Sequence, residues 1–232
     1  MQRTLSVKIQ YSLCAGALLL SLFTAHAGAA SIVSDFDNAG NGLDGWTVIG
    51  DPVGGAATYQ ATGGNPGGFA QVSDNGAGAV IYWAAPSKFH GNLSSYLGGT
   101  LRFDMSQSPL ANLFLATLGD IQLVSPGLTL VTEVFSNANL PTLAFQTETV
   151  SLSTSTAWRV GTTGGALATA SDLQTVLGNV TGILIRGEIS LLIDTNGLDN
   201  VVLEQNVPEP STAALLLAGL AAAFAFRKRV SH

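Results

Sequence analysis

The sequence of 232 residues is poor in the side chains that most often carry reactive or metal chemistry. It has one cysteine and three histidines. The cysteine, Cys14, lies in an apolar N-terminal segment, so residues 28–206 have none, which excludes disulfides and thiolate chemistry there. His90 is the only histidine of residues 28–206, and this excludes a two-histidine metal site in that part of the chain.

Positive charge is also scarce. Between residues 28 and 206, four cations stand against fourteen acidic residues, a formal balance of −10. The cations are Lys88, Arg102, Arg159 and Arg186. Because nucleic acids and anionic lipids are bound largely through Lys and Arg, this balance excludes binding to either of them by charge. An acidic surface suits divalent cations, but it is also the ordinary composition of a solvated face.

Residues 1–27 have the pattern of a signal peptide. A positive region with Arg3 and Lys8 precedes the apolar core Leu13–Phe23, and Ala25-His26-Ala27 supplies a small-x-small cleavage site. The core of 11 residues is short for a helix that remains in the membrane. We expect this segment to direct the chain through the Sec translocon and to be removed by signal peptidase.

Residues 207–232 combine three features in order. They are the triplet Pro208-Glu209-Pro210, the apolar run Ser211–Phe226, and the basic cluster Arg227-Lys228-Arg229. Proline keeps the chain extended, alanine and leucine favour a helix, and the cations prefer the cytoplasmic side of a membrane. As a helix, the apolar run would be about 24 Å long, against ~30 Å of hydrocarbon in a bilayer.

This order of features resembles the PEP-CTERM sorting signal of Gram-negative bacteria. The resemblance implies recognition by an exosortase-type membrane protease. It also implies transient anchoring in the inner membrane by an apolar sorting helix, followed by release to the cell surface or extracellular matrix. A permanent single-span anchor is the alternative, and the short apolar run favours the processed signal.

Residues 28–206 have the pattern of one all-β domain. Short runs rich in β-branched and aromatic residues alternate with clusters of Gly, Asn, Asp and Pro. In Leu101–Met105, apolar residues alternate with Arg102 and Asp104, which places one face inward and the other in water. Many short strands in a domain of this length favour a jelly-roll β-sandwich. One stretch, residues 168–177, is expected to be helical, with Ser171 as its N-cap.

Several segments of residues 28–206 resemble, in order, the laminin B domain (laminin domain IV). The segments are Asp44–Val48, Gly64–Gly68, Tyr82–Asn92, Tyr96–Phe103, Trp158-Arg159-Val160, Leu173–Glu188 and Leu198–Leu203. The resemblance implies an extracellular β-sandwich of jelly-roll type, related in shape to carbohydrate-binding modules. It implies no catalytic activity, and a fold alone licenses no ligand.

Two sets of residues are candidates for binding. Tyr82 and Trp83 could stack on a sugar ring, although as neighbours on a strand they point to opposite faces, and packing in the core is the alternative. Jelly-roll modules often hold a structural calcium ion where the first and last strands meet. Asp37 and Asp199 match that arrangement by position and have the oxygen ligands that Ca²⁺ prefers. The alternative is that both make turn and cap hydrogen bonds. No other cofactor is expected.

The sequence therefore predicts an exported, non-enzymatic surface or matrix protein that acts in adhesion or associates with the exopolysaccharide of a biofilm matrix. No Gly-x-Ser-x-Gly motif and no phosphate-binding glycine loop is present. The alternative is a secreted carbohydrate-active enzyme, because the spacing of two catalytic carboxylates is three-dimensional and cannot be recognised in a sequence. A passive matrix protein without a specific ligand is the third hypothesis.

Overall fold

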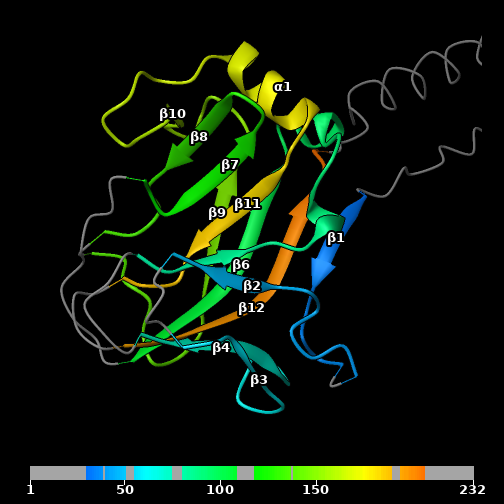
Figure 1. Cartoon of the computed structure of the whole chain (residues 1–232), viewed down its shortest axis with the longest axis vertical. Coiled ribbons are helices and arrows are strands. Elements are labelled where there is room, and N and C mark those ends of the chain that lie inside the picture. Colours follow the sequence, from blue (N-terminus) through cyan, green and yellow to red (C-terminus); the bar gives the residue numbers. More distant parts are fainter. Residues whose placement is uncertain are drawn as a thin grey trace, which may run out of the picture.

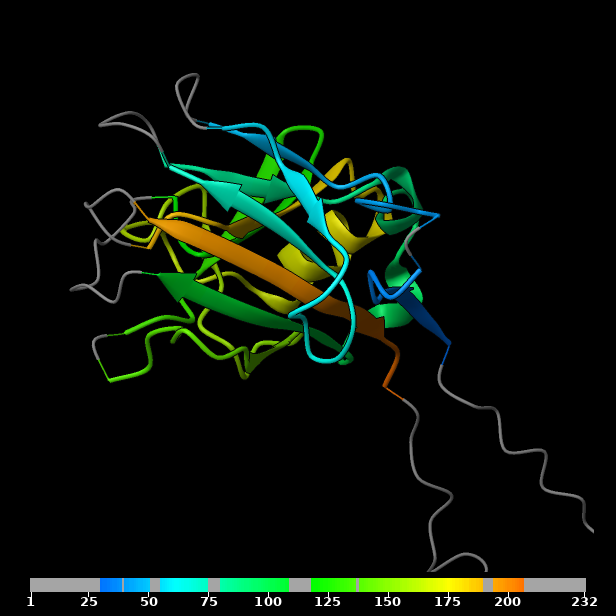
Figure 2. The same ribbon diagram turned by 90° about the horizontal axis from the view of Figure 1, so that it is seen from below.

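The computed structural model describes residues 30–38, 40–50, 55–74, 80–108, 118–136, 138–189 and 194–206. The expected signal peptide and sorting tail lie outside these residues, and so do the tail's motif residues Pro208, Glu209, Pro210, Arg227, Lys228 and Arg229. The division of the chain into signal peptide, body and tail therefore stays a prediction. Within the described residues, two antiparallel sheets form a sandwich with one α-helix at its end, as Figures 1 and 2 show. The expected β-sandwich is confirmed.

The first sheet has the strand order β3-β4-β12-β6-β9, and β1 also pairs with β12. Its long central strands, β6 and β12, run side by side (Figure 1). The strands are β1 (Ser31–Ser34), β3 (Thr58–Gln60), β4 (Phe69–Ser73), β6 (Thr100–Ser108), β9 (Gln146–Ser151) and β12 (Thr195–Glu204). The register between β12 and β6 shifts between Asp199 and Val202, which marks a bulge in this central pair.

The second sheet has the strand order β10-β8-β7-β11-β5-β2. Its strands are β2 (Thr47–Ile49), β5 (Tyr82–Ala84), β7 (Ile121–Ser125), β8 (Leu128–Thr132), β10 (Arg159–Val160) and β11 (Gly182–Arg186). Two short 3₁₀ turns, η1 (Ser87–Phe89) and η2 (Ser94–Tyr96), follow β5. Every strand pairing in this sheet is antiparallel.

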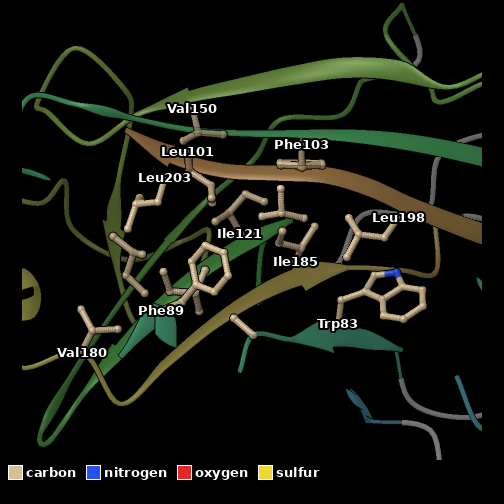
Figure 3. Packing of buried hydrophobic residues seen from close by; sticks show 14 of the residues in the cluster. Trp83, Phe89, Leu101, Phe103, Ile121, Val150, Val180, Ile185, Leu198 and Leu203 are labelled. Atoms are coloured by element: carbon tan, nitrogen blue, oxygen red, sulfur yellow. The ribbon is translucent and has the colours of Figure 1, made fainter. Parts of the chain in front are cut away.

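The hydrophobic core lies between the two sheets (Figure 3). On β6, Leu101, Phe103 and Met105 are fully buried, which confirms the inward face that their alternation predicts. Asp104 is on the opposite face of β6, as expected, but it is only 2% exposed. The expectation that this face lies in water is therefore wrong at Asp104, because another part of the chain covers it.

The α-helix α1 spans Ala170–Gly178 and buries Leu173, Val176 and Leu177. The expected helix is confirmed, but its N-cap is Thr169 rather than Ser171. Thr169 accepts from the backbone N–H of Asp172, and the Asp172 carboxylate accepts from the backbone N–H of Thr169, which together make a capping box. Across the described ranges, no helix combines the length and the apolar character needed to cross a membrane.

Candidate functional site

The structure brings the two predicted calcium ligands, Asp37 and Asp199, into one acidic cluster together with Asp104. Asp199 on β12 and Asp104 on β6 are directly paired in register, and both are buried. Asp37 follows β1 and is exposed, but its charge acts on Asp199. A side chain at Gly67 would collide with the Asp37 carboxylate, since a Cβ there would lie 2.0 Å from Asp37 Oδ1. The sequence did not indicate that Asp104 belongs to this cluster.

Two asparagines bridge the carboxylates of Asp104 and Asp199. Asn65 donates its backbone N–H to Asp199 Oδ2 over 2.7 Å and its side-chain amide to Asp104 Oδ2 over 3.0 Å. Asn200 does the same with its backbone N–H to Asp199 Oδ1 and its amide to Asp104 Oδ2, both over 2.8 Å. Thr147 completes the set by donating its hydroxyl to Asp104 Oδ1 over 2.6 Å. The loop that contains Asn65 therefore packs onto the outer face of the first sheet.

The environment of Asp199 favours its protonated form. Burial is the main cause and raises the pKa of Asp199 to about 6, and the nearby charges of Asp104 and Asp37 act in the same direction. The backbone donors of Asn65 and Asn200 oppose this rise in pKa because they stabilise the carboxylate. The two neighbouring aspartates thus share a site in which burial and the charge of the other carboxylate raise the pKa of Asp199 to about 6.

The hydrogen bonds of this cluster leave little room for the predicted calcium ion. Both oxygens of Asp199 and both oxygens of Asp104 already accept hydrogen bonds from amide or hydroxyl groups. Among the residues that the structure describes, no group of three His, Cys, Asp or Glu side chains is arranged to hold a metal ion. Calcium would require oxygen ligands where amide donors now stand. The arrangement does not fit the ion as it is folded, and calcium at Asp37 and Asp199 stays a prediction that chelation can test.

The structure buries Tyr82 and Trp83, which corrects their expected role as a sugar platform. Tyr82 is 4% exposed and donates its hydroxyl to the Gly119 carbonyl over 2.7 Å. Trp83 is fully buried in the core (Figure 3) and donates Nε1–H to Asn196 Oδ1 over 2.8 Å. Their strand, β5, lies inside the second sheet between β11 and β2. Neither ring offers a face to solvent, so both are packing residues.

A different pair of aromatic residues lies on the outer face of the first sheet. On β4, Ala70 and Val72 point into the core, so Phe69 points outward. Phe145, just before β9, meets Phe69 edge to face with ring centroids 5.2 Å apart. Both rings are half-buried. The signal for Phe69 was present in the alternation of β4, but the pairing depends on the sheet order and could not be predicted from the sequence.

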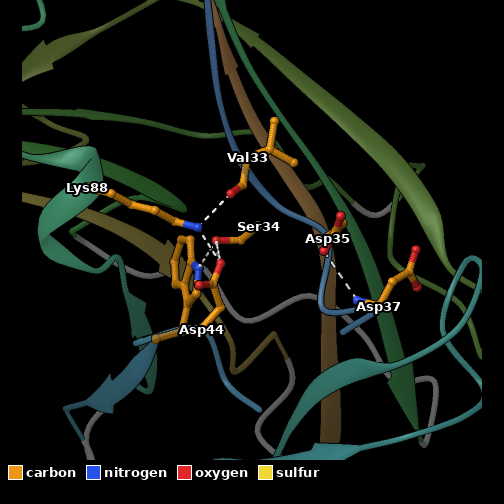
Figure 4. Close-up of polar contacts among 7 residues, drawn as sticks. Val33, Ser34, Asp35, Asp37, Asp44 and Lys88 are labelled. Carbon is orange, nitrogen blue, oxygen red and sulfur yellow. Dashed lines mark hydrogen bonds and ion pairs between the residues drawn. The ribbon is translucent and has the colours of Figure 1, made fainter. Parts of the chain in front are cut away.

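Segments that resemble the laminin B domain contain structural contacts. Figure 4 shows Lys88 beside Asp44 and Ser34: Lys88 forms an ion pair with Asp44 and donates to the Val33 carbonyl over 2.6 Å. Ser34 donates to Asp44 over 2.8 Å and accepts from Trp46 Nε1 over 2.9 Å. These contacts tie β1 to the turn before β2 and to η1. Asp37 lies apart from this network (Figure 4). Its backbone N–H donates to Asp35 Oδ1 over 3.3 Å.

A second structural network surrounds Arg186, at the end of β11. Arg186 and Asp120 form a buried ion pair with Nη1 3.1 Å from Oδ1. Arg186 Nε–H also donates to the Glu188 carbonyl. The other oxygen of Asp120 accepts the backbone N–H groups of Val134 and Phe135 over 2.7 and 2.8 Å. All partners are engaged with one another, so this network holds the second sheet together and offers no group to a ligand.

Two family models match parts of this chain. The model of laminin B (domain IV) matches residues 82–217, more than half of the chain. The chain belongs to the laminin B (domain IV) family. Lys88 and Arg186, which hold the structural networks, both lie inside the matched range. The model of the PEP-CTERM protein-sorting motif matches residues 206–229, and this motif implies an exported, surface-sorted protein that an exosortase processes.

The comparison with solved structures found, among others, a laminin domain and a carbohydrate-binding module. The L4b domain of human laminin alpha-2 superposes with a TM-score of 0.53 at 12% identity, covering 78% of this chain and 100% of that domain. A family 11 carbohydrate-binding module from a Clostridium thermocellum cellulase gives a TM-score of 0.46 at 16% identity, covering 79% of this chain and 99% of the module. At such identities the likeness shows the fold alone. No curated protein sequence matches the chain.

Proposed function

We propose that the chain is an exported, non-enzymatic surface or matrix protein whose laminin B domain adheres to extracellular polysaccharide. The observation that carries this proposal is the combination of a sorting motif at residues 206–229 with a β-sandwich of the laminin domain IV type. The motif supports delivery of the domain to the outside of the cell, where extracellular polysaccharide would be its ligand. The laminin domain IV type of β-sandwich supports a binding role over a catalytic one.

The acidic cluster supports binding over the enzyme alternative. A glycoside hydrolase needs two carboxyl groups that flank the scissile bond and reach its atoms. Asp104 and Asp199 are one pair of neighbouring carboxyl groups, and the raised pKa of Asp199 would suit a general acid. However, Asp199 is fully buried, and amide and hydroxyl donors occupy the oxygens of both residues. The pair therefore has no access to a glycosidic bond in this fold.

The export half of the proposal can be tested by intact mass. In a host that has an exosortase, the mature protein should lack Phe226 and the basic cluster Arg227-Lys228-Arg229 that follows it. The same protein expressed in a host whose exosortase gene is deleted is the control and should retain them. An intact C-terminus in surface protein from the unmodified host would support the permanent anchor instead.

The binding half separates the three functional hypotheses in one assay. The secreted protein is incubated with the host's own extracellular polysaccharide, and both sedimented protein and newly formed reducing ends are measured. Saturable retention without new reducing ends is the result that we expect. Turnover without saturable retention would establish the enzyme alternative. Protein that is neither retained nor active would be a passive matrix component, and the proposal would fall.

A further inference from the structure

The outer face of the first sheet holds an aromatic strip at its centre, which we define as Phe69 and Phe145 above Gly197. Gly197 lies on β12 between Gln71 of β4 and Ser106 of β6, its partners in register. A Cβ at Gly197 would lie 2.9 Å from Phe145 Cζ and 3.1 Å from Phe69 Cδ2. The glycine therefore leaves space in which both rings lie against the backbone of the central strand.

The strip is apolar where an outer sheet face is usually polar. Phe69 and Phe145 are half-buried and meet at an interplanar angle of 75°, so they form one continuous apolar surface with an edge and a face. Leu143, which is 68% exposed, precedes Phe145 in the same segment. Both rings lie outside the core cluster between the two sheets.

Neutral polar groups border the strip along the direction that crosses the strands. On the β3–β4 side, Gln60 Nε2 donates to Gln71 Oε1 and to Thr58 Oγ1, each over 3.2 Å. On the β6–β9 side are Ser106 and the exposed Thr147. Amide and hydroxyl groups thus stand on both sides of the apolar centre, on strands of which each lies about 4.8 Å from the next. This spacing is comparable with the length of one sugar residue.

We propose that this strip is the ligand site of the laminin B domain and that its ligand is a neutral polysaccharide. The inference rests on the proposed function and specifies its site. The apolar C–H face of a pyranose would cover the exposed phenylalanine surface, while its hydroxyls would reach the amide and hydroxyl groups on either side. The chain of sugars would run across the strands.

The charges near the strip select against an acidic polysaccharide. Asp104 and Asp199 occupy the row of residues next to Gly197 on the same face, and Asp37 adds its charge from the loop after β1. Arg102 is on this face too, but it lies beyond Asp104, farther from the strip. A uronic-acid polymer would meet net repulsion there. A protein partner is also disfavoured, because two half-buried rings are a small apolar centre for an interface that buries ~800 Å² on each side.

The test uses the secreted protein and the host's extracellular polysaccharide, separated by anion exchange into neutral and acidic fractions. Wild-type protein should bind the neutral fraction more tightly. Phe69→Ala and Phe145→Ala should each weaken that binding at least tenfold. Leu143→Ala, which removes an exposed apolar side chain from the same segment, is the matched control and should bind like wild type.

Two further variants guard against misfolding as the cause. Phe145→Tyr keeps a ring of the same shape and should retain binding, and Gln71→Ala should weaken it about threefold without touching either ring. Melting temperatures of all variants are measured alongside. Tighter binding to the acidic fraction, or wild-type affinity in both alanine variants, would overturn the site while the proposed function stands. Wild-type protein that binds neither fraction would overturn both.

Discussion

Two buried aspartates, Asp120 and Asp199, show how differently the same side chain can be accommodated in this sandwich. Asp120 in the second sheet is paired with Arg186 and accepts two backbone N–H groups. Asp199 in the first sheet also accepts two backbone N–H groups, but its nearest charged neighbours are further aspartates, and burial raises its pKa to about 6. The Arg186 cation neutralises the charge of Asp120, whereas Asp199 changes its protonation state at about pH 6. The first stabilises the fold, and the second borders the proposed ligand site.

The largest effect on stability is expected from breaking the buried ion pair between Asp120 and Arg186. Arg186→Ala would leave the Asp120 carboxylate buried without its cation, which costs about 3–5 kcal/mol of unfolding free energy. Urea denaturation measures the loss. Arg102→Ala removes a half-exposed arginine from the first sheet and should cost less than ~1 kcal/mol. Equal losses in the two variants would show that the Asp120–Arg186 pair has no special role.

The next effect concerns the pH dependence that Asp199 gives to stability. Because folding raises its pKa, its contribution is fully present below the ordinary value of 3.8 and is lost as the pH rises through about 6. Between pH 4 and pH 7 this loss should amount to about 2 kcal/mol, a little less than the whole shift would give because part of the change occurs below pH 4. Thermal unfolding across this range measures it, and stability that rises steadily to pH 7 would contradict the assignment.

A smaller effect is expected from neutralising Asp104, the neighbour of Asp199. Asp104→Asn removes one negative charge beside Asp199, yet its oxygen can still accept from the amides of Asn65 and Asn200. Its new amide can donate to the Thr147 hydroxyl, which now donates to Asp104. Unfolding free energy at pH 7 should rise by about 0.5–1 kcal/mol, and the pH dependence should flatten. A loss of stability at pH 7 would show that the two carboxylates do not repel each other.

The smallest effect is expected from chelation. Since hydrogen-bond donors occupy the oxygens of Asp104 and Asp199, EDTA should leave the melting temperature unchanged within a degree or so. Asp199→Ala provides the control for specificity. A melting temperature that EDTA lowers in the wild type but not in Asp199→Ala would establish the calcium site at Asp37 and Asp199 and would require the asparagine amides to turn.

The sequence was sufficient for the features that depend on local patterns. The alternation in β6 predicts the inward face of Leu101, Phe103 and Met105, and the apolar spacing predicts α1. Asp37 and Asp199 were paired through the arrangement of jelly-roll modules rather than through a local pattern, and the structure brings both into one cluster. Local periodicity identifies which face of an element is apolar, and the core residues of β6 and α1 needed nothing more.

The remaining features depend on contacts between distant segments. Asp104 is covered because the loop with Asn65 packs across β6 and β12, and strand alternation carries no information about such a loop. Tyr82 is buried although it faces away from Trp83, because β5 is an interior strand with Gly119 close to its hydroxyl. Phe69 and Phe145 meet only through the order β4-β12-β6-β9, which the sequence did not define.

The most direct test of the account is the distribution of the protein between the extracellular matrix and the medium. It should be measured in the host and in a strain that makes no extracellular polysaccharide, with secretion matched between them. We predict that the protein fractionates with the matrix in the first strain and appears in the medium in the second. An unchanged distribution would contradict the claim that this laminin B domain is exported to hold polysaccharide.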